Sequence, residues 1–143
     1  MTDVQKAAGT KSYVGGCHCG AVRFEVALDL SQPLSRCNCS ICAKVAQTGT
    51  NVKPAAFRLT SGSGALSEYR WGEVGARYFC KLCGIHVYGA GHLEYLGGDF
   101  VSVNCNTLDD VDPNHDVKVI YFDGRHDNWM AGPRETPWPI HTR

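Results

Sequence analysis

Seven of the eight cysteines in this 143-residue chain lie in three short clusters. The clusters are Cys17-His18-Cys19-Gly20, Cys37-Asn38-Cys39-Ser40-Ile41-Cys42 and Cys80-Lys81-Leu82-Cys83-Gly84. Thiolates grouped in this way are typical ligands of a soft divalent ion, which takes about four sulfur or nitrogen ligands in a tetrahedron. Close local pairs supply such ligands at little cost in loop-closure entropy. The clusters therefore predict metal binding.

The first and third clusters together contain four cysteines. The spacings Cys-x-Cys and Cys-x-x-Cys-Gly supply the ligands of a closed structural site, which would join two distant parts of the chain. The glycine after the second pair can take a positive φ angle, and the N–H groups of the turn can then point at the sulfurs. We expect structural zinc here, with iron in the same tetrahedron as the alternative, on Cys17, Cys19, Cys80 and Cys83.

The central cluster supplies only three thiols, those of Cys37, Cys39 and Cys42. Three protein ligands with an open fourth position are the arrangement of catalytic zinc, where water or a substrate thiolate completes the tetrahedron. Ser40 is in position to cap a short helix, and the positive end of such a helix lowers the pKa of a nearby thiol. The alternative is a second structural site, with Cys105 or a histidine as its fourth ligand.

The last cysteine and the histidines fit packing or solvent exposure better than metal binding. Cys105 lies in an apolar segment, where a buried thiol packs as a small apolar side chain. His18 alternates with its cysteine neighbours and therefore points away from them. His126 could reach a pocket as an acid or base. Together with Arg125, Trp129 and Trp138 it could also line the mouth of the three-cysteine site. A packed C-terminal cover explains the same residues.

The segments between the clusters must position these side chains. Alternation of apolar and polar residues predicts half-buried strands separated by glycine-rich turns, at residues 21–26, 54–60, 66–71, 76–79, 85–88, 100–105 and 117–122. Residues 1–12 are small and polar, and we expect a flexible tail there. For residues 13–143 the pattern predicts one mainly β domain with metal bound at its loops.

The bulk composition excludes several classes of protein. Fourteen Lys and Arg balance fourteen Asp and Glu, so clustered positive charge for nucleic acid or an anionic membrane is not expected. No apolar run reaches the length of a signal peptide or a membrane span, which predicts a cytoplasmic protein. In a reducing compartment, eight cysteines are expected as metal-bound or catalytic thiolates rather than disulfides.

The ordered set of three clusters resembles the glutathione-dependent formaldehyde-activating enzyme family, which includes centromere protein V. The match extends around each cluster, over residues 16–24, 37–42, 79–84 and, more weakly, 106–110. The resemblance implies a β-tent-like fold with one structural zinc on the four cysteines of the outer clusters. It also implies a second, labile and catalytic zinc on Cys37, Cys39 and Cys42.

The activity implied by this resemblance is that of a carbon–sulfur lyase. Glutathione, or a related thiol, and formaldehyde would combine reversibly to an S-hydroxymethyl adduct. Zinc with an open position suits that chemistry, because it holds a thiolate near neutral pH or polarises an aldehyde oxygen. Centromere protein V points to the alternative, a non-catalytic zinc-stabilised binding module. A closed second site with four ligands would favour that alternative.

Overall fold

The computed structural model describes residues 9–70 and 72–141, and within them the chain is mainly β, as the sequence predicts. The strands are β1 (Thr10–Gly16), β2 (Arg23–Asp29), β3 (Leu34–Cys37), β4 (Gly49–Val52), β5 (Phe57–Ser61), β6 (Leu66–Arg70), β7 (Gly75–Cys80), β8 (His86–Leu93), β9 (Gly98–Asn104) and β10 (Val119–Phe122). The helical segments are α2 (Ser40–Val45) and the 3-10 turns η1 (Pro54–Ala56), η2 (Ser63–Ala65), η3 (Glu94–Leu96), η4 (Cys105–Thr107), η5 (Gly124–His126) and η6 (Trp129–Ala131).

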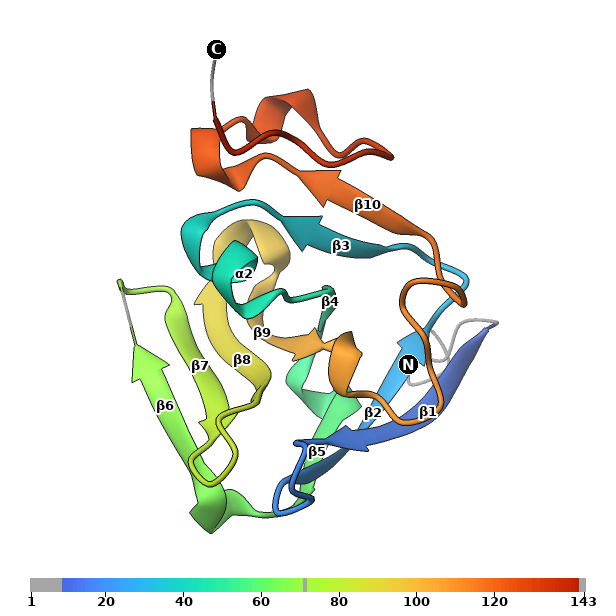
Figure 1. Cartoon of the computed structure of the whole chain (residues 1–143), viewed down its shortest axis with the longest axis vertical. Helices are drawn as coiled ribbons and strands as arrows, with labels where there is room; N and C mark the ends of the chain where they lie inside the picture. Colours follow the sequence, from blue (N-terminus) through green and yellow to red (C-terminus); the bar gives the residue numbers. More distant parts are fainter. Residues whose placement is uncertain (1–8, 71, 142–143) are drawn as a thin grey trace.

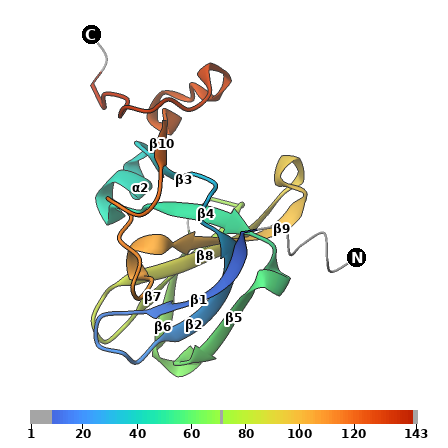
Figure 2. The same cartoon turned by 90° about the vertical axis from the view of Figure 1, so that its right-hand side faces the viewer.

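The strands form two sheets (Figure 1). A three-stranded antiparallel sheet has the order β1-β2-β5, and a seven-stranded sheet has the order β10-β3-β4-β9-β8-β7-β6. The larger sheet is antiparallel apart from its β10–β3 edge, where the two strands run parallel. That edge and the C-terminal segment lie at one end of the molecule, and the smaller sheet lies toward the other end (Figure 2).

The core lies between the two sheets. Every second residue of β2 is buried, which is the alternation expected of a strand with one covered face. Four aromatic rings form a continuous contact from one sheet to the other, with centroid distances of 5.2, 4.5 and 4.9 Å along the series Phe24, Phe57, Tyr88 and Tyr78. Full burial of one such large apolar side chain is worth about 1.5–3 kcal/mol. The smaller sheet is thus held firmly against the larger one.

Most of the predicted strands are present, and their ends differ for identifiable reasons. The sequence predicts a tail through residue 12, but β1 already begins at Thr10, which pairs with Asp29 of β2. The rest of that prediction concerns residues 1–8, which lie outside the described residues. The strand predicted over 54–60 starts late because Pro54 opens a 3-10 turn, whose first position suits its fixed φ angle.

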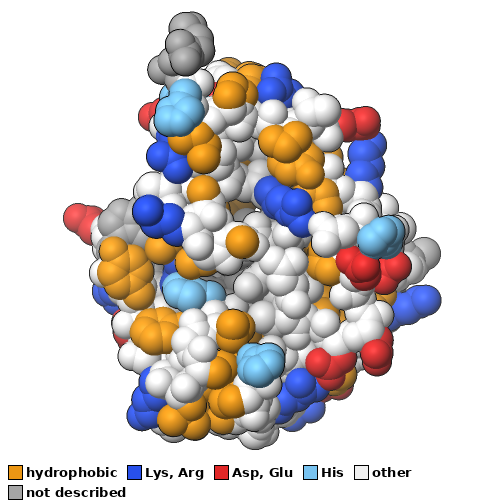
Figure 3. All heavy atoms as spheres, viewed as in Figure 1, with side chains coloured by type: hydrophobic (Ala, Val, Ile, Leu, Met, Phe, Trp, Pro, Cys, Tyr) orange, Lys and Arg blue, Asp and Glu red, His pale blue; other side chains and the backbone are white. Residues whose placement is uncertain are grey.

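The surface shows no strong bias of charge on the face that Figure 3 presents, where basic and acidic side chains are interspersed. This agrees with the equal numbers of basic and acidic residues in the sequence. In the part of the chain that the structure describes, no helix is both long enough and apolar enough to cross a membrane.

Candidate metal centre and active site

The four outer cysteines come together from two turns of different sheets. Cys17 and Cys19 follow β1, and Gly20 takes a φ angle of 85° in the turn that leads to β2. Cys80 ends β7 and Cys83 follows in the turn to β8. Gly84, with a φ angle of 80°, donates its N–H to the carbonyl of Cys80, which closes this turn as the sequence predicts.

The spacing of these four sulfurs suits a single metal ion. All four lie within 4.8 Å of one another, and in residues 9–70 and 72–141 this is the one group of three or more potential ligands gathered so closely. Sγ–Sγ distances are 3.6 Å for Cys17–Cys19 and 3.7 Å for Cys19–Cys80. A tetrahedron with zinc–sulfur bonds of about 2.3 Å has edges of about 3.8 Å. The four-cysteine cluster therefore fits a zinc ion.

Backbone N–H groups also point at these sulfurs. Val22 N lies 3.3 Å from Cys17 Sγ, and Leu82 N lies 3.4 Å from Cys80 Sγ. The backbone N–H of Ile85 lowers the pKa of Cys83 to about 6. Such bonds favour the thiolate, which is the form that binds metal. Cys17 and Cys80 are buried, Cys83 is half-buried and Cys19 is exposed, so one side of the cluster faces solvent.

The three-cysteine stretch is built from one short local segment. Cys37 ends β3, Cys39 occupies the N-cap position of α2, and Cys42 lies within that helix. The prediction that Ser40 caps the helix is wrong, because Ser40 is its first helical residue and no side chain caps it. The Cys39 N–H instead lies 3.4 Å from Cys37 Sγ, so the chain bends around that sulfur.

The three thiols are less tightly gathered than the four-cysteine cluster, because their sulfur atoms do not all lie within 4.8 Å of one another. Hydrogen bonds from Cys37 and Cys42 lower the pKa of Cys39 to about 2. The same sharing raises the pKa of Cys42, first through its bond to Cys37. The pKa of Cys37 is also raised, first through its bond to Cys39, so only one of the three pKa values is lowered. A helix N-terminus alone would lower all three.

An arginine from another strand contacts this group. Arg77 of β7 has its Nη2 atom 3.3 Å from Cys42 Sγ and its Nη1 atom 3.0 Å from Gln47 Oε1. Gln47 in turn donates to Ser102 of β9 at 3.0 Å. The positive charge of Arg77 acts on the thiol group from the side of the large sheet, and it contributes to the low pKa of Cys39.

The C-terminal segment packs on the opposite side of the stretch. The parallel pairing of Phe122 with Cys37 places the residues after β10 beside Asn38. Asn38 donates to the buried carboxylate of Asp123 at 2.8 Å, and Arg125 contacts Asn38 through its backbone N–H and its Nε atom, each at 2.9 Å. A Cβ atom on Gly124 would lie 2.5 Å from Cys37 Sγ, so only glycine fits there.

The other predicted candidates have packing or solvent roles. Cys105 is fully buried and its pKa is raised to about 12 by burial, which confirms a packed core thiol. His126 lies 2.7 Å from Asp123 Oδ1 within the C-terminal cover. His86 stacks on Phe79, and burial followed by the charge of Arg77 lowers its pKa. Its buried Nδ1 atom has no hydrogen-bond partner among the described residues.

Sequence reasoning missed three contributors to this site. Arg77 occupies an ordinary strand position, and nothing in its neighbourhood in the sequence distinguishes it from a solvated charge. Asp123 and Gly124 approach the cysteines only because β10 pairs with β3, a contact between residues far apart in the chain. The signal that the sequence offered was an Asp-Gly pair directly after the last predicted strand.

Comparisons with known proteins give this arrangement a family context. A curated protein of Halomonas elongata is 37% identical over 78 residues, and one of Penicillium rubens is 31% identical over 105 residues. These alignments cover 48% and 66% of this chain, and 50% and 55% of the relatives. The chain therefore spans about half the length of these two relatives. Both carry the provisional name of a glutathione-dependent formaldehyde-activating enzyme.

A solved structure and a family profile agree with that likeness. The crystal structure of a Rhodobacter sphaeroides protein superposes with a TM-score of 0.66 at 28% identity, over 76% of this chain and 99% of the other. The family profile described as glutathione-dependent formaldehyde-activating enzyme matches residues 12–123, which include all three cysteine clusters. This chain belongs to the glutathione-dependent formaldehyde-activating enzyme family.

Proposed function

We propose that this protein is a zinc-dependent carbon–sulfur lyase that joins glutathione, or a related small thiol, to formaldehyde or a related aldehyde. The observation that carries the proposal is the half-exposed group of three interacting thiols beside Arg77. A closed structural site needs about one more ligand than this group contains. Family membership supports the same chemistry. The eight free thiols suit a reducing compartment such as the cytoplasm.

The proposal divides the cysteines between two metal ions. Structural zinc is assigned to the four-cysteine cluster, and a second zinc to Cys37, Cys39 and Cys42. Zinc held by three thiolates supplies a Lewis acid with a position for a substrate thiolate or aldehyde oxygen. The lowered pKa of Cys39 supports this assignment, because the thiolate is the form that binds metal.

The residues around the three thiols have separate tasks in this proposal. Arg77 donates to Cys42 and concentrates positive charge where an anionic sulfur must come. Asn38, held by Asp123 and Arg125, fixes the turn between Cys37 and Cys39. In the reaction the thiol sulfur bonds to the carbonyl carbon, and the thiol proton ends on the carbonyl oxygen. The reverse reaction breaks the same carbon–sulfur bond.

The test is the rate of adduct formation with and without the open thiol group. Glutathione and isotope-labelled formaldehyde are mixed, and the S-hydroxymethyl product is followed by NMR with wild-type protein and with Cys39→Ser. We expect the catalysed rate of the variant to fall by at least about a hundredfold, because the central thiolate is lost. Its melting temperature should stay close to that of the wild type.

Two results would contradict the proposal. One is a Cys39→Ser variant with unchanged turnover, which would remove the three thiols from the chemistry. The other is a wild-type protein that leaves the uncatalysed rate unchanged while it holds two zinc ions. The second result would favour a non-catalytic zinc-stabilised binding module.

A further inference from the structure

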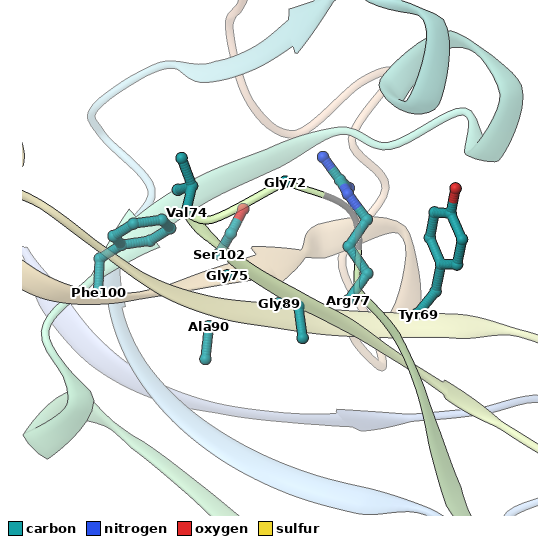
Figure 4. Close-up of a pocket in the computed structure, with 10 residues that line it drawn as sticks. Tyr69, Gly72, Val74, Gly75, Arg77, Gly89, Ala90, Phe100 and Ser102 are labelled. Carbon is teal, nitrogen blue, oxygen red and sulfur yellow. The ribbon is translucent and has the colours of Figure 1, made fainter.

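A cleft of about 390 Å³ opens on the face of β7, β8 and β9, and Arg77, which contacts Cys42, is one of the residues that line it. Openings of about 300–1,000 Å³ are typical of small-molecule sites. Figure 4 shows the residues that line it: Phe100 and Val74 lie at one end, and Arg77 and Tyr69 at the other. The cleft therefore begins at the side chain that contacts the Cys42 thiol and extends away from it.

Small residues form the floor of this cleft. Gly89 lies opposite Arg77 on β8 and opposite Ser102 on β9, so all three positions share one face of the sheet. Side chains on that face point into the cleft, and at Gly89 there is none to fill it. A Cβ atom there would lie 3.0 Å from the carbonyl oxygen of Ala76 and 3.7 Å from Cγ of Arg77. Glycine thus keeps open the space directly beside the arginine.

The cationic end of the cleft has unused donors. In the described part of the chain the hydrogen-bond partners of Arg77 are Gln47 and Cys42, neither of which is a carboxylate. A guanidinium has more N–H donors than these two bonds use. The bonds also hold the group in one orientation, which reduces the entropy lost when an anion binds. The opposite end, with Val74 and Phe100, is apolar.

We infer that this cleft binds the organic body of the thiol substrate, whose carboxylate pairs with Arg77 while its sulfur reaches the three-cysteine stretch. The inference rests on the proposed function and adds to it a substrate class, thiols that carry a carboxylate near the sulfur. Because Arg77 lies only 3.3 Å from Cys42 Sγ, a small molecule can reach Arg77 with its carboxylate and the three-cysteine stretch with its sulfur at the same time. An apolar thiol without a carboxylate would lack the charged contact and bind less tightly.

The test measures binding separately from turnover. The probes are 3-mercaptopropionate and 3-mercaptopropionamide, which have the same size and differ in charge, and their dissociation constants are measured by calorimetry on zinc-loaded full-length protein. We expect the acid to bind wild-type protein about ten- to a hundredfold more tightly than the amide, because its carboxylate can form charge-assisted hydrogen bonds with Arg77. Arg77→Gln should abolish this preference. Arg58→Gln, which breaks an ion pair with Glu25 on the other sheet, should leave it unchanged.

A second variant tests whether the effect of Arg77→Gln arises indirectly, through a change in metal binding. Gly89→Val fills the cleft without removing a contact to Cys42, and it should weaken both probes by about tenfold or more with the zinc content unchanged. Equal affinity of the acid and the amide for wild-type protein would overturn the inference. So would a preference that survives Arg77→Gln. A preference for the acid without any turnover would instead contradict the proposed function and leave the cleft assignment standing.

Discussion

The two groups of clustered cysteines differ in how the chain assembles them. The four-cysteine cluster takes its thiols from turns in two different sheets, and two of the four are buried. The three-cysteine stretch takes all its thiols from six consecutive residues at the end of β3 and the start of α2. A metal ion in the first group would close a long loop and join the two sheets. An ion in the second group would connect only residues that are already close in the chain.

In the proposed function this difference separates the site that stabilises the fold from the site that carries the chemistry. A site that joins distant segments is lost when the fold is lost, so its ion is hard to exchange. A local, half-exposed site gives up its ion at a smaller cost to the fold, and a substrate can reach it. The surroundings also differ: backbone N–H groups contact sulfurs in both sets, but only the second set has a cationic side chain, Arg77, on one of its sulfurs, and Arg77 also lines the cleft.

The largest effect is expected from loss of one thiol in the four-cysteine cluster. Cys80→Ser removes a fully buried ligand, and we expect the free energy of unfolding to fall by about 3 kcal/mol or more. Thermal unfolding followed by circular dichroism measures this change. Cys39→Ser is the matched control, because it removes a thiol from the local stretch. Equal destabilisation by both variants would break the comparison between the two groups.

Partial removal of metal should distinguish the two cysteine groups in the wild-type protein, because their ions are expected to leave at different rates. We expect wild-type protein to hold two zinc ions per chain and to retain one after mild chelation, because the local site exchanges faster. Turnover should be lost at that stage, while the melting temperature changes little. Elemental analysis, an activity assay and thermal unfolding on the same samples check this. One ion that never leaves would show that the three-cysteine stretch holds no metal.

A smaller effect is expected at the contact between the C-terminal segment and Cys37. Gly124→Ala would place a methyl group 2.5 Å from the sulfur, so the η5 turn must shift away. We expect the affinity for the second zinc to fall by about tenfold, as for other changes around metal ligands, with the first site unaffected. Competition with a zinc chelator measures both affinities. Gly64→Ala, where a Cβ meets no atom within 4 Å, is the control and should change neither.

The smallest effect concerns an ion-pair group away from both cysteine groups. His92 lies 2.7 Å from Asp99 and 2.7 Å from Glu94, and these carboxylates, Asp99 first, raise its pKa. A raised pKa adds stability that is fully present below the unfolded-state value, about 6.5, and is lost as the pH rises through the folded-state pKa.

Because all three side chains of this group are exposed, we expect the melting temperature to fall by about 1 °C or less across this range. His92→Gln should remove this slope when melting temperatures are measured from pH 5.5 to 8.5. An unchanged slope in the variant would show that other titrating groups cause it.

The sequence alone was sufficient for most of the strands, although not for β3 or β4, and for the four-cysteine cluster. The alternation of residues 21–26 depends on local periodicity, and β2 shows the expected burial of every second residue. The Cys-x-Cys and Cys-x-x-Cys-Gly spacings carry their own turn geometry, so pairing them required only that four thiols are needed around one ion. Cys105 was also predictable, because an isolated cysteine in an apolar segment is usually packed.

Only the tertiary structure decided what surrounds the three-cysteine stretch. The parallel pairing of β10 with β3 brings Asp123 and Gly124 to the thiols from residues far along the chain. The order of the large sheet places Arg77 and the glycine floor of the cleft beside α2. Strand order and register arise from the sum of many long-range contacts, which no local pattern encodes. The candidate ligands could therefore be identified from the sequence, whereas the side chains that contact them could not.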